Sequence, residues 1–291
     1  MNIIQIYERF PTQQDCIAHL EAVRWPDGPV CPYCGSLNAT PRPKEHRHHC
    51  NGCNTTFSVA VRTIFHHTHL PLQKWFLAIA LTLNAKKGLS ARQLARDLSI
   101  NKNTAWRIAM QIRRAMSQAE QRELLTGLVE VDECYIGGKP RKGRPDYRTT
   151  RGRGTKKTPV VGMVERGGRV KAEAVKKTDL TAKRLSALVR RNVDIVNATL
   201  ITDEFHGYIG IKRFMPHEMV KHRIWYVDGY RHTNTIESFW AILKRGFVGQ
   251  YHKVSLRYLP WYIDEFCYRF NHRKNDDVFN LTIRRAVGVN T

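Results

Sequence analysis

The spacing of apolar residues predicts a helical first part of the chain and a mixed second part. Within residues 1–30, apolar side chains recur at near-helical spacing and predict a short amphipathic helix. Residues 70–83 are expected to form one helix, and residues 89–116 two helices with a break at 99–101. Residues 117–127 are then expected to be a linker, after which the period of the pattern changes.

Alternating apolar and polar positions beyond this linker predict strands. Residues 128–136 form the first, and 160–166 with 169–175 predict a hairpin. The remaining expected elements are a helix at 181–192, a strand at 198–205, and helices at 233–245 and 256–270. Strands interleaved with helices indicate an α/β or α+β domain.

Length and composition narrow the class of protein. A chain of 291 residues suggests two domains, or three if one is small, and 42% hydrophobic residues exclude a wholly disordered chain. The longest apolar stretch, 75–83, is about half the length that spans a bilayer. Residues 1–20 lack the continuous apolar core of a signal peptide. We therefore expect a cytoplasmic protein that does not enter a membrane.

The charge of the chain points to an anionic partner. Lys and Arg number 48 against 25 Asp and Glu, a formal net charge of +23, which favours nucleic acid first and an anionic membrane surface second. The stretch 139–157 is too polar to build a core, so we expect a basic insertion between two strands, in phosphate contact or simply solvated. Its candidate phosphate ligands are Arg141, Lys142, Arg144, Arg151, Arg153, Lys156 and Lys157.

Two Cys-x-x-Cys pairs, CPYC at 31–34 and CNGC at 50–53, have the spacing of a zinc ribbon. The expected ligands of one zinc ion are Cys31, Cys34, Cys50 and Cys53. Four thiolates close the coordination shell, so this zinc would be structural. The alternative is a redox pair or buried thiols.

Residues 89–114 have the pattern of a helix-turn-helix, with 102–114 as the recognition helix. An apolar interior is supplied by Leu94, Leu98, Ile100, Ile108 and Ile112. The side chains expected to face DNA bases or phosphates are Lys102, Asn103, Thr104, Trp106, Arg107, Arg113 and Arg114. A plain helical hairpin with a basic face is the alternative.

Three acids fall where a metal site could form. Asp132 lies within a strand, with Glu130 on the same face, and Asp203 lies where an apolar strand ends. Glu237 sits on an expected helix and shares a face with Lys244 two turns later. The apolar stripe of this helix is formed by Ile236, Phe239, Trp240 and Leu243. Three such carboxylates can gather two Mg²⁺ ions for phosphoryl chemistry. Each acid alone could instead pair with one of the many basic residues.

Taken in order, these motifs resemble a known family. The strings VDECYIGGK (131–139), ITDEFHGY (201–208) and HTNTIESFWAILKRG (232–246), behind a zinc ribbon and a helix-turn-helix, resemble the ISXO-type DDE transposases of bacterial insertion sequences, relatives of the Merlin transposons. The resemblance implies a mixed α/β fold whose catalytic domain is RNase H-like, as in retroviral integrases. It also implies that Asp132, Asp203 and Glu237 bind two catalytic Mg²⁺ or Mn²⁺ ions. Lys244, with Arg245 beside it, would contact DNA.

The resemblance further implies an organisation and a reaction. Residues 1–60 would hold the N-terminal helix and ribbon, 61–120 the helix-turn-helix, and 128–291 the catalytic domain. The protein would cleave transposon ends by hydrolysis and join the 3′-hydroxyls to target DNA. Its partner would be double-stranded DNA, both terminal inverted repeats and target, and it would act as a homodimer or larger assembly, associated with the nucleoid.

Some alternatives stay open. Certain relatives carry Asn at the third catalytic position, and Asn234 lies one turn before Glu237. Neighbouring acids could assist the site or pair with Arg: Glu130, Glu133, Glu204 and Asp228. A tyrosine nucleophile such as Tyr135 or Tyr208 is possible but not needed. A DNA-binding regulator without chemistry, or a metal-dependent endonuclease without strand transfer, would share many of these features.

Overall fold

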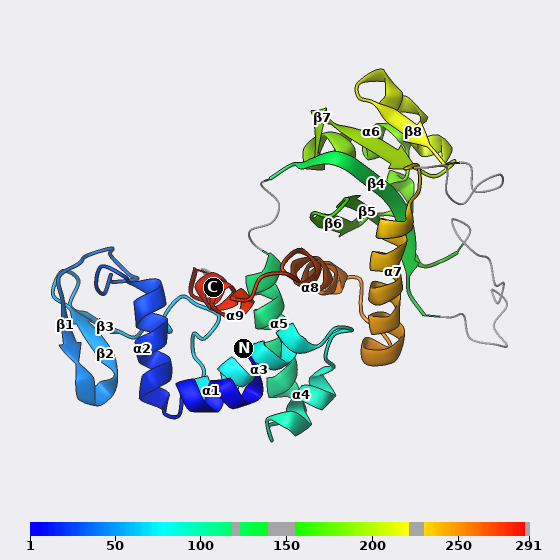
Figure 1. The fold of residues 1–291 in the computed structure, drawn as a ribbon. Coiled ribbons are helices and arrows are strands. Elements are labelled where there is room, and N and C mark those ends of the chain that lie inside the picture. The colour runs from blue at the N-terminus through cyan, green and yellow to red at the C-terminus, as the bar shows by residue number, and fades with distance from the viewer. Residues whose placement is uncertain (118–122, 139–154, 221–229, 289–291) are drawn as a thin grey trace. The chain divides into compact units, whose positions relative to one another are not determined.

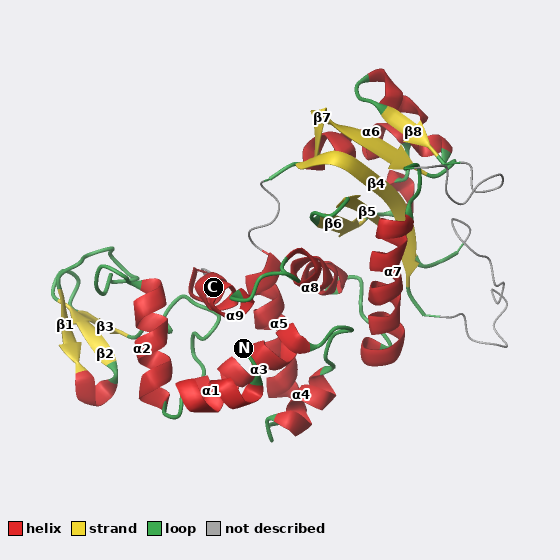
Figure 2. Ribbon diagram, in the orientation of Figure 1, coloured by secondary structure: helices red, strands yellow, loops and turns green. Residues whose placement is uncertain are grey.

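The computed structural model describes residues 1–117, 123–138, 155–220 and 230–288. The chain forms two compact units, one from Met1–Gln118 with Lys274–Thr291 and the other from Ala119–Arg273. Figures 1 and 2 show the elements of each unit. No helix in the described ranges is both long and apolar enough to cross a membrane.

The first unit joins a small antiparallel sheet to a group of helices. Its elements are α1 (Ile3–Arg9), α2 (Gln13–Arg24), β1 (Ala39–Arg42), the 3-10 helix η1 (Pro43–Glu45), β2 (Arg47–Cys50), β3 (Thr55–Phe57), α3 (Leu72–Asn84), α4 (Ala91–Asp97), α5 (Lys102–Ser117) and α9 (Val278–Gly288). The N-terminal segment forms two helices, where the pattern predicted one. Pro11 cannot continue α1, and Thr12 then caps α2 through a reciprocal pair of hydrogen bonds with Asp15.

The C-terminal helix α9 was not predicted, and it packs in the first unit against α2, α3 and α5. The ring of Phe279 lies 5.7 Å from that of Phe76, which in turn lies 4.9 Å from Phe10. The division of the chain therefore differs from the expected domains. The segment from Lys274 onward belongs to the first unit and not to the unit that holds the strands of 128–202.

The second unit is built on a five-stranded sheet in the order β6-β5-β4-β7-β8. Its elements are β4 (Leu125–Ile136), β5 (Thr158–Glu165), β6 (Val170–Ala174), the 3-10 helix η3 (Lys177–Asp179), α6 (Ala182–Asn192), β7 (Val193–Thr202), the 3-10 helix η4 (His206–Arg213), β8 (His217–Met219), α7 (Asn234–Gly246), the π-helix η5 (Phe247–Tyr251) and α8 (Leu259–Asn271). β4, β5 and β6 pair antiparallel, whereas β7 pairs parallel with β4 and with β8. The mixed α/β, RNase H-like fold expected from the resemblance is confirmed.

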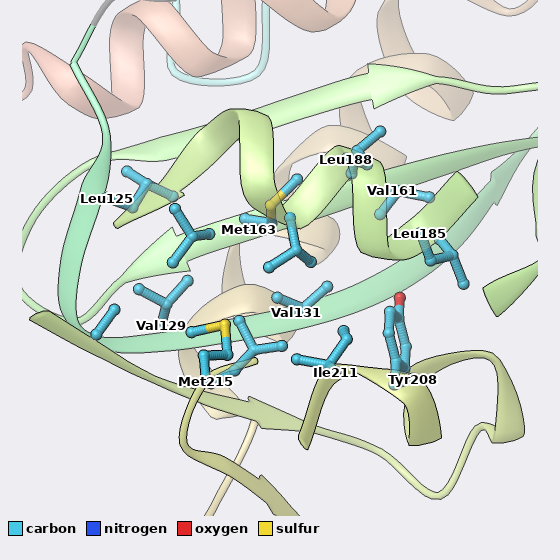
Figure 3. Close-up of a cluster of buried hydrophobic side chains, with 14 residues drawn as sticks. Leu125, Val129, Val131, Val161, Met163, Leu185, Leu188, Tyr208, Ile211 and Met215 are labelled. Carbon is cyan, nitrogen blue, oxygen red and sulfur yellow. The ribbon is translucent and has the colours of Figure 1, made fainter. Parts of the chain in front are cut away.

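Side chains alternate between the two faces of this sheet, as strand geometry requires. One face packs against α6 and η4 through a buried apolar cluster that includes Val129 and Val131 of β4 and Leu185 of α6 (Figure 3). The other face packs against α7, since a side chain on Gly162 of β5 would collide with Trp240. β4 is the central strand of this sheet. Because helices cover both faces, the polar side chains of β4 lie among packed residues.

Two strands, β4 and β7, begin well before the residues that the pattern predicted. β4 starts at Leu125, inside the expected linker, and its register with β7 shifts between Leu125 and Gly127. Gly127 has a φ of +64°, which glycine adopts without strain, so a bulge interrupts the alternation there. β7 starts at Val193, whereas the pattern predicted 198. Most of the basic insertion, residues 139–154, lies outside the described residues.

Candidate active site and zinc cluster

Asp132 lies mid-strand on the α7 face of β4, as the alternation predicted. Its Oδ2 accepts a hydrogen bond of 3.0 Å from the indole Nε1 of Trp240 in α7. Burial raises the pKa of Asp132 to about 7; the backbone amide of Glu133 opposes this rise, while the charges of Glu133 and Asp203 add to it. The surroundings therefore destabilise the ionised form of Asp132. This is typical of a carboxylate that binds a cation, because the cation restores the stability of the charged form.

Asp203 is next to Asp132 across the sheet. Val131 of β4 pairs with Thr202, the last residue of β7, and these two strands are parallel. Asp132 and Asp203 are the next residues after this pair, so they lie next to each other. The side chain of Asp203 accepts a hydrogen bond from the amide of Phe205, which holds it at the turn after the strand. The structure thus brings together two of the three acids that the sequence singled out.

Glu237 lies on the exposed side of α7. The apolar stripe predicted for this helix is buried, as its four residues Ile236, Phe239, Trp240 and Leu243 all face the interior. The carboxylate of Glu237 accepts a hydrogen bond of 3.1 Å from the hydroxyl of Thr233. Among the described residues, Glu237 does not join Asp132 and Asp203 in a group tight enough to count as a preformed metal cluster. Asn234, its alternative, is also exposed.

Lys244 is exposed near the C-terminal end of α7, with Arg245 beside it. Burial raises the pKa of the Cys134 thiol on β4, and the positive charge of Lys244 opposes that rise. The ammonium group is therefore within electrostatic reach of the face of β4 that carries Asp132.

Two neighbouring acids have structural partners. Glu130 is fully buried and pairs with Arg166, and Glu133 points to the opposite face, where it accepts a hydrogen bond from Tyr208. Tyr208 is itself buried, and this burial, together with Glu133, raises its pKa well above the usual value. A buried phenol held on a carboxylate is not placed to act as a nucleophile. Asp228 lies outside the described residues.

The four cysteines of the first unit form a compact cluster. Their sulfur atoms all lie within 4.8 Å of one another, with 3.7 Å between Cys31 and Cys53 and 3.5 Å between Cys34 and Cys50. Gly35 turns the first knuckle with a φ of +77°. Four soft donors at this spacing fit tetrahedral Zn²⁺, so the cluster could hold a zinc ion, as predicted.

The thiols of this cluster are not equivalent. Hydrogen bonds from the backbone, chiefly the amide of Cys53, lower the pKa of Cys50 to about 6. The amide of Ser36 acts in the same direction on Cys34, but the neighbouring sulfurs outweigh it and raise that pKa to about 12. Adjacent thiols cannot all ionise without a cation between them.

The helices α4 and α5 form the predicted pair around a tight turn. Ser99 has a φ of +50° at the turn, and the side chain of Asn101 accepts a hydrogen bond from the amide of Asn103. The interior residues are buried except Ile100, which is half-buried. The exposed side chains at the start of α5 are Lys102, Asn103, Thr104, Trp106 and Arg107.

Arg113 departs from its expected place near phosphates. It is only 2% exposed, and its Nη1 lies 3.5 Å from the sulfur of Met110, because the inner face of α5 packs against other helices. Arg114 is half-buried and bonds to Gln111. Of the insertion, Lys156 is exposed and Lys157 half-buried; its five arginine and lysine candidates from Arg141 to Arg153 lie outside the described residues.

The residues that the sequence reasoning missed are those that tie α7 to the sheet. Arg166 and Thr235 both bind Glu130, and Gly162 makes room for Trp240. The one available signal was Gly162 itself, because a glycine inside an apolar strand often marks a close approach of another element.

Known proteins share this organisation. The ISXO2-like transposase domain matches residues 124–271, and the transposase zinc-ribbon domain matches residues 11–56. A Halobacterium salinarum protein described as an uncharacterized protein in transposable element ISH50 is 30% identical over 262 residues, which cover 85% of this chain and 87% of that protein.

Two solved structures also match. The Mos1 transposase paired-end complex with left transposon end is 16% identical, with a TM-score of 0.28 over 68% of this chain and 74% of that one. A pre-cleavage Mos1 transpososome is 13% identical, with a TM-score of 0.27 over 73% and 78%. Because the transposase domain spans about half of the chain and the ISH50 relative most of it, the chain belongs to the ISXO2-like transposase family.

Proposed function

We propose that this protein is the transposase of an insertion sequence, which binds the terminal inverted repeats, cleaves the transposon ends and joins their 3′-hydroxyls to target DNA. The observation that carries the proposal is the pair of adjacent carboxylates, Asp132 and Asp203, at neighbouring parallel strands beside the helix that bears Glu237 and Lys244. Membership of the transposase family supports the same class of reaction.

The donor set fits a hard divalent cation. Asp132, Asp203 and Glu237 would hold Mg²⁺ or Mn²⁺, since carboxylate oxygens are the ligands these ions prefer. When bound, two such ions would supply charge neutralisation at the phosphate and activation of the attacking oxygen. The raised pKa of Asp132 supports this assignment, because a cation would offset the cost of burying the charged carboxylate and the repulsion from its acidic neighbours.

The other residues of the site would orient and bind. Trp240 fixes the carboxylate of Asp132 through its indole, and Thr233 holds that of Glu237. The ammonium group of Lys244 would bind a DNA phosphate near the reacting bond. Water would attack the phosphodiester at the transposon end, and the 3′-hydroxyl released there would then attack a phosphodiester of the target DNA. Neither reaction requires a covalent bond between DNA and a protein side chain.

DNA binding would use the first unit and the basic surface. The exposed residues at the start of α5 would enter a groove, and Lys156, Lys157 and Arg245 would meet phosphates. The zinc cluster would stabilise the fold of the ribbon within the first unit. Joining two transposon ends calls for two active sites, so the assembly on DNA would be a dimer or larger.

A strand-transfer assay tests the proposal. Purified protein, a labelled duplex carrying the terminal repeat that flanks the gene, supercoiled plasmid and Mg²⁺ are mixed, with Glu237→Gln alongside. We expect the wild type to join label to plasmid and the variant to join none. Cleavage without joining would instead indicate an endonuclease. Binding without either reaction, and without any difference between the two proteins, would leave a DNA-binding regulator.

A further inference from the structure

Glu130 is a buried acid whose carboxylate is bound by several donors of the second unit. It is 0% exposed and sits two residues before Asp132, on the same face of β4. Its carboxylate accepts hydrogen bonds from the amide of Thr235 at 2.8 Å, from the amide of Ile236 at 3.0 Å and from the Thr235 hydroxyl at 2.9 Å. These amides belong to the first turn of α7, so a strand residue caps the helix from more than a hundred positions away.

A basic pair completes the cap. The Nε of Arg166 donates to Glu130 at 2.7 Å, and its Nη2 donates to the backbone carbonyl of His232 at 2.8 Å. The ring Nδ1 of His232 lies 3.3 Å from the same carboxylate. Arg166 comes from the end of β5, so the residues that lead into α7 are bound to two adjacent strands at once.

A second attachment lies one turn further along α7. Trp240 donates to Asp132, the next residue of β4 on that face. Two strand steps from Glu130 to Asp132 span about 6.7 Å, and four helix steps from Ile236 to Trp240 span about 6 Å. The two rises match, so the helix can contact the strand at both points. Figure 1 shows α7 beside β4.

Gly162 keeps the two elements close. It lies opposite Asp132 in the β4–β5 pair, and a Cβ placed there would come within 2.4 Å of the Trp240 ring. The indole therefore occupies the space that any other residue at position 162 would fill. Together, Glu130, Gly162 and Trp240 determine both how far α7 extends along the strand and how close it lies.

We propose that Glu130 is a positioning residue of the active site, which sets the place of α7 and hence of Glu237 and Lys244 relative to Asp132. This inference rests on the proposed function. Burying a carboxylate with an arginine is costly compared with apolar packing, and a side chain near the helix start could cap it at lower cost. What the buried pair adds is a definite register between strand and helix, which a metal site assembled from both elements requires.

The test compares Glu130→Gln with Glu173→Gln. The control residue, Glu173, lies on β6 and forms an exposed ion pair with Arg191. Its substitution makes the same chemical change, carboxylate to amide, at a position away from α7. Three quantities are measured at a temperature where all proteins are folded: hydrogen exchange at the amides of Thr235 and Ile236, binding of the terminal-repeat duplex, and the single-turnover rate of joining a pre-cut 3′-hydroxyl end across a Mg²⁺ series.

We expect Glu130→Gln to exchange these amides faster, to bind DNA as the wild type does, and to join about 10- to 100-fold more slowly with a higher Mg²⁺ requirement. Glu173→Gln should match the wild type throughout. If Glu130→Gln does not fold, Thr235→Val removes one hydroxyl bond to Glu130 and should show the same changes at smaller size.

Two results would overturn the inference. One is wild-type joining and Mg²⁺ dependence in a variant whose amides have lost protection. The other is unchanged protection of those amides. A wild type that joins no DNA would count against the proposed function instead, and the exchange measurement would still decide whether Glu130 holds the helix.

Discussion

The two candidate metal sites of this protein differ in how far the chain assembles them. The four cysteines of the first unit already lie within the spacing of a tetrahedral shell. In the second unit, Asp132 and Asp203 are adjacent, but Glu237 on α7 stays outside any such cluster of described residues.

The difference follows from charge and connectivity. Each knuckle supplies two thiols a few residues apart, and a hairpin of short strands brings the two knuckles together. Local turns are therefore enough to place the four sulfur atoms. The cysteines also tolerate close approach, because without a cation the four groups need not all carry a charge at once. The carboxylates come from three separate elements and repel one another, so their approach depends on long-range packing and on a cation. A structural site can be preassembled in this way, whereas a catalytic site keeps room for substrate.

The largest effect is expected from breaking the cysteine cluster. Cys50→Ala removes a ligand, and the zinc-binding free energy that stabilises such sites is of order 10 kcal/mol, so the ribbon should lose both metal and order. Zinc content and thermal unfolding measure the change. Cys16→Ala, a buried cysteine outside the cluster, should keep one zinc per chain. Equal zinc content in the two variants would contradict the assignment.

Asp132→Asn should have the opposite effect on stability. With a pKa near 7 against an ordinary 3.8, the folded state binds a proton that the unfolded chain has released between about pH 4 and 7. Stability is therefore lost as pH rises through that window. Without divalent cations the variant should be more stable than the wild type at pH 8, by about 4 kcal/mol.

The same variant provides its own control. The gain should fall below about 1 kcal/mol near pH 4, where the wild-type carboxyl is protonated in the folded state and about half protonated in the unfolded chain, and urea unfolding at the two pH values measures it. Mg²⁺ should stabilise the wild type but not the variant. A gain independent of pH would mean that packing, and not charge, is responsible.

Gly162→Ala should weaken the attachment of α7. The added methyl group would meet the Trp240 ring, and relief of such overpacking costs about 1–3 kcal/mol. Chemical unfolding measures the loss, and joining activity should fall with it. Gly210→Ala serves as the control, since its Cβ would lie 3.8 Å from the hydroxyl oxygen of Ser186, in ordinary van der Waals contact. Equal stabilities would show that α7 can shift without cost.

The smallest effect is expected at the DNA surface. Arg107 is exposed on α5, and replacing it by Ala should weaken duplex binding by about 1 kcal/mol and reduce the salt dependence by about one charge, without changing stability. Fluorescence titration over a range of salt concentrations measures both. Lys177→Ala, also exposed but on η3, should leave binding as it is. A stronger effect from Lys177 would place the DNA elsewhere.

Local patterns predicted much of this molecule. The spacing of Ile236, Phe239, Trp240 and Leu243 predicted the buried stripe of α7, and the alternation along β4 predicted that Glu130 and Asp132 share a face. The cysteine spacing predicted the sulfur cluster, because its geometry depends on short turns.

What the sequence did not show depends on partners far apart in the chain. Nothing near Glu130 indicates that its carboxylate caps a helix that starts at Asn234, or that α9 returns to pack on Phe76. The spacing of Phe279, Ile283 and Val287 could have predicted α9 as a helix, but not where it packs. Arg113 carries the charge expected of a phosphate ligand, and only the packing of α5 shows that it is buried.

The central claim, that the adjacent acids of the second unit make this protein a DNA strand transferase, is tested most directly at Asp203. The joining of labelled transposon ends to plasmid in Mg²⁺ is compared for the wild type, Asp203→Asn and Asp179→Asn. Asp179 is a half-buried aspartate paired with Arg184. We predict that Asp203→Asn lowers joining by about a thousandfold, or about 4 kcal/mol in the barrier, while Asp179→Asn joins as the wild type does. Equal joining by the wild type and Asp203→Asn would contradict the account.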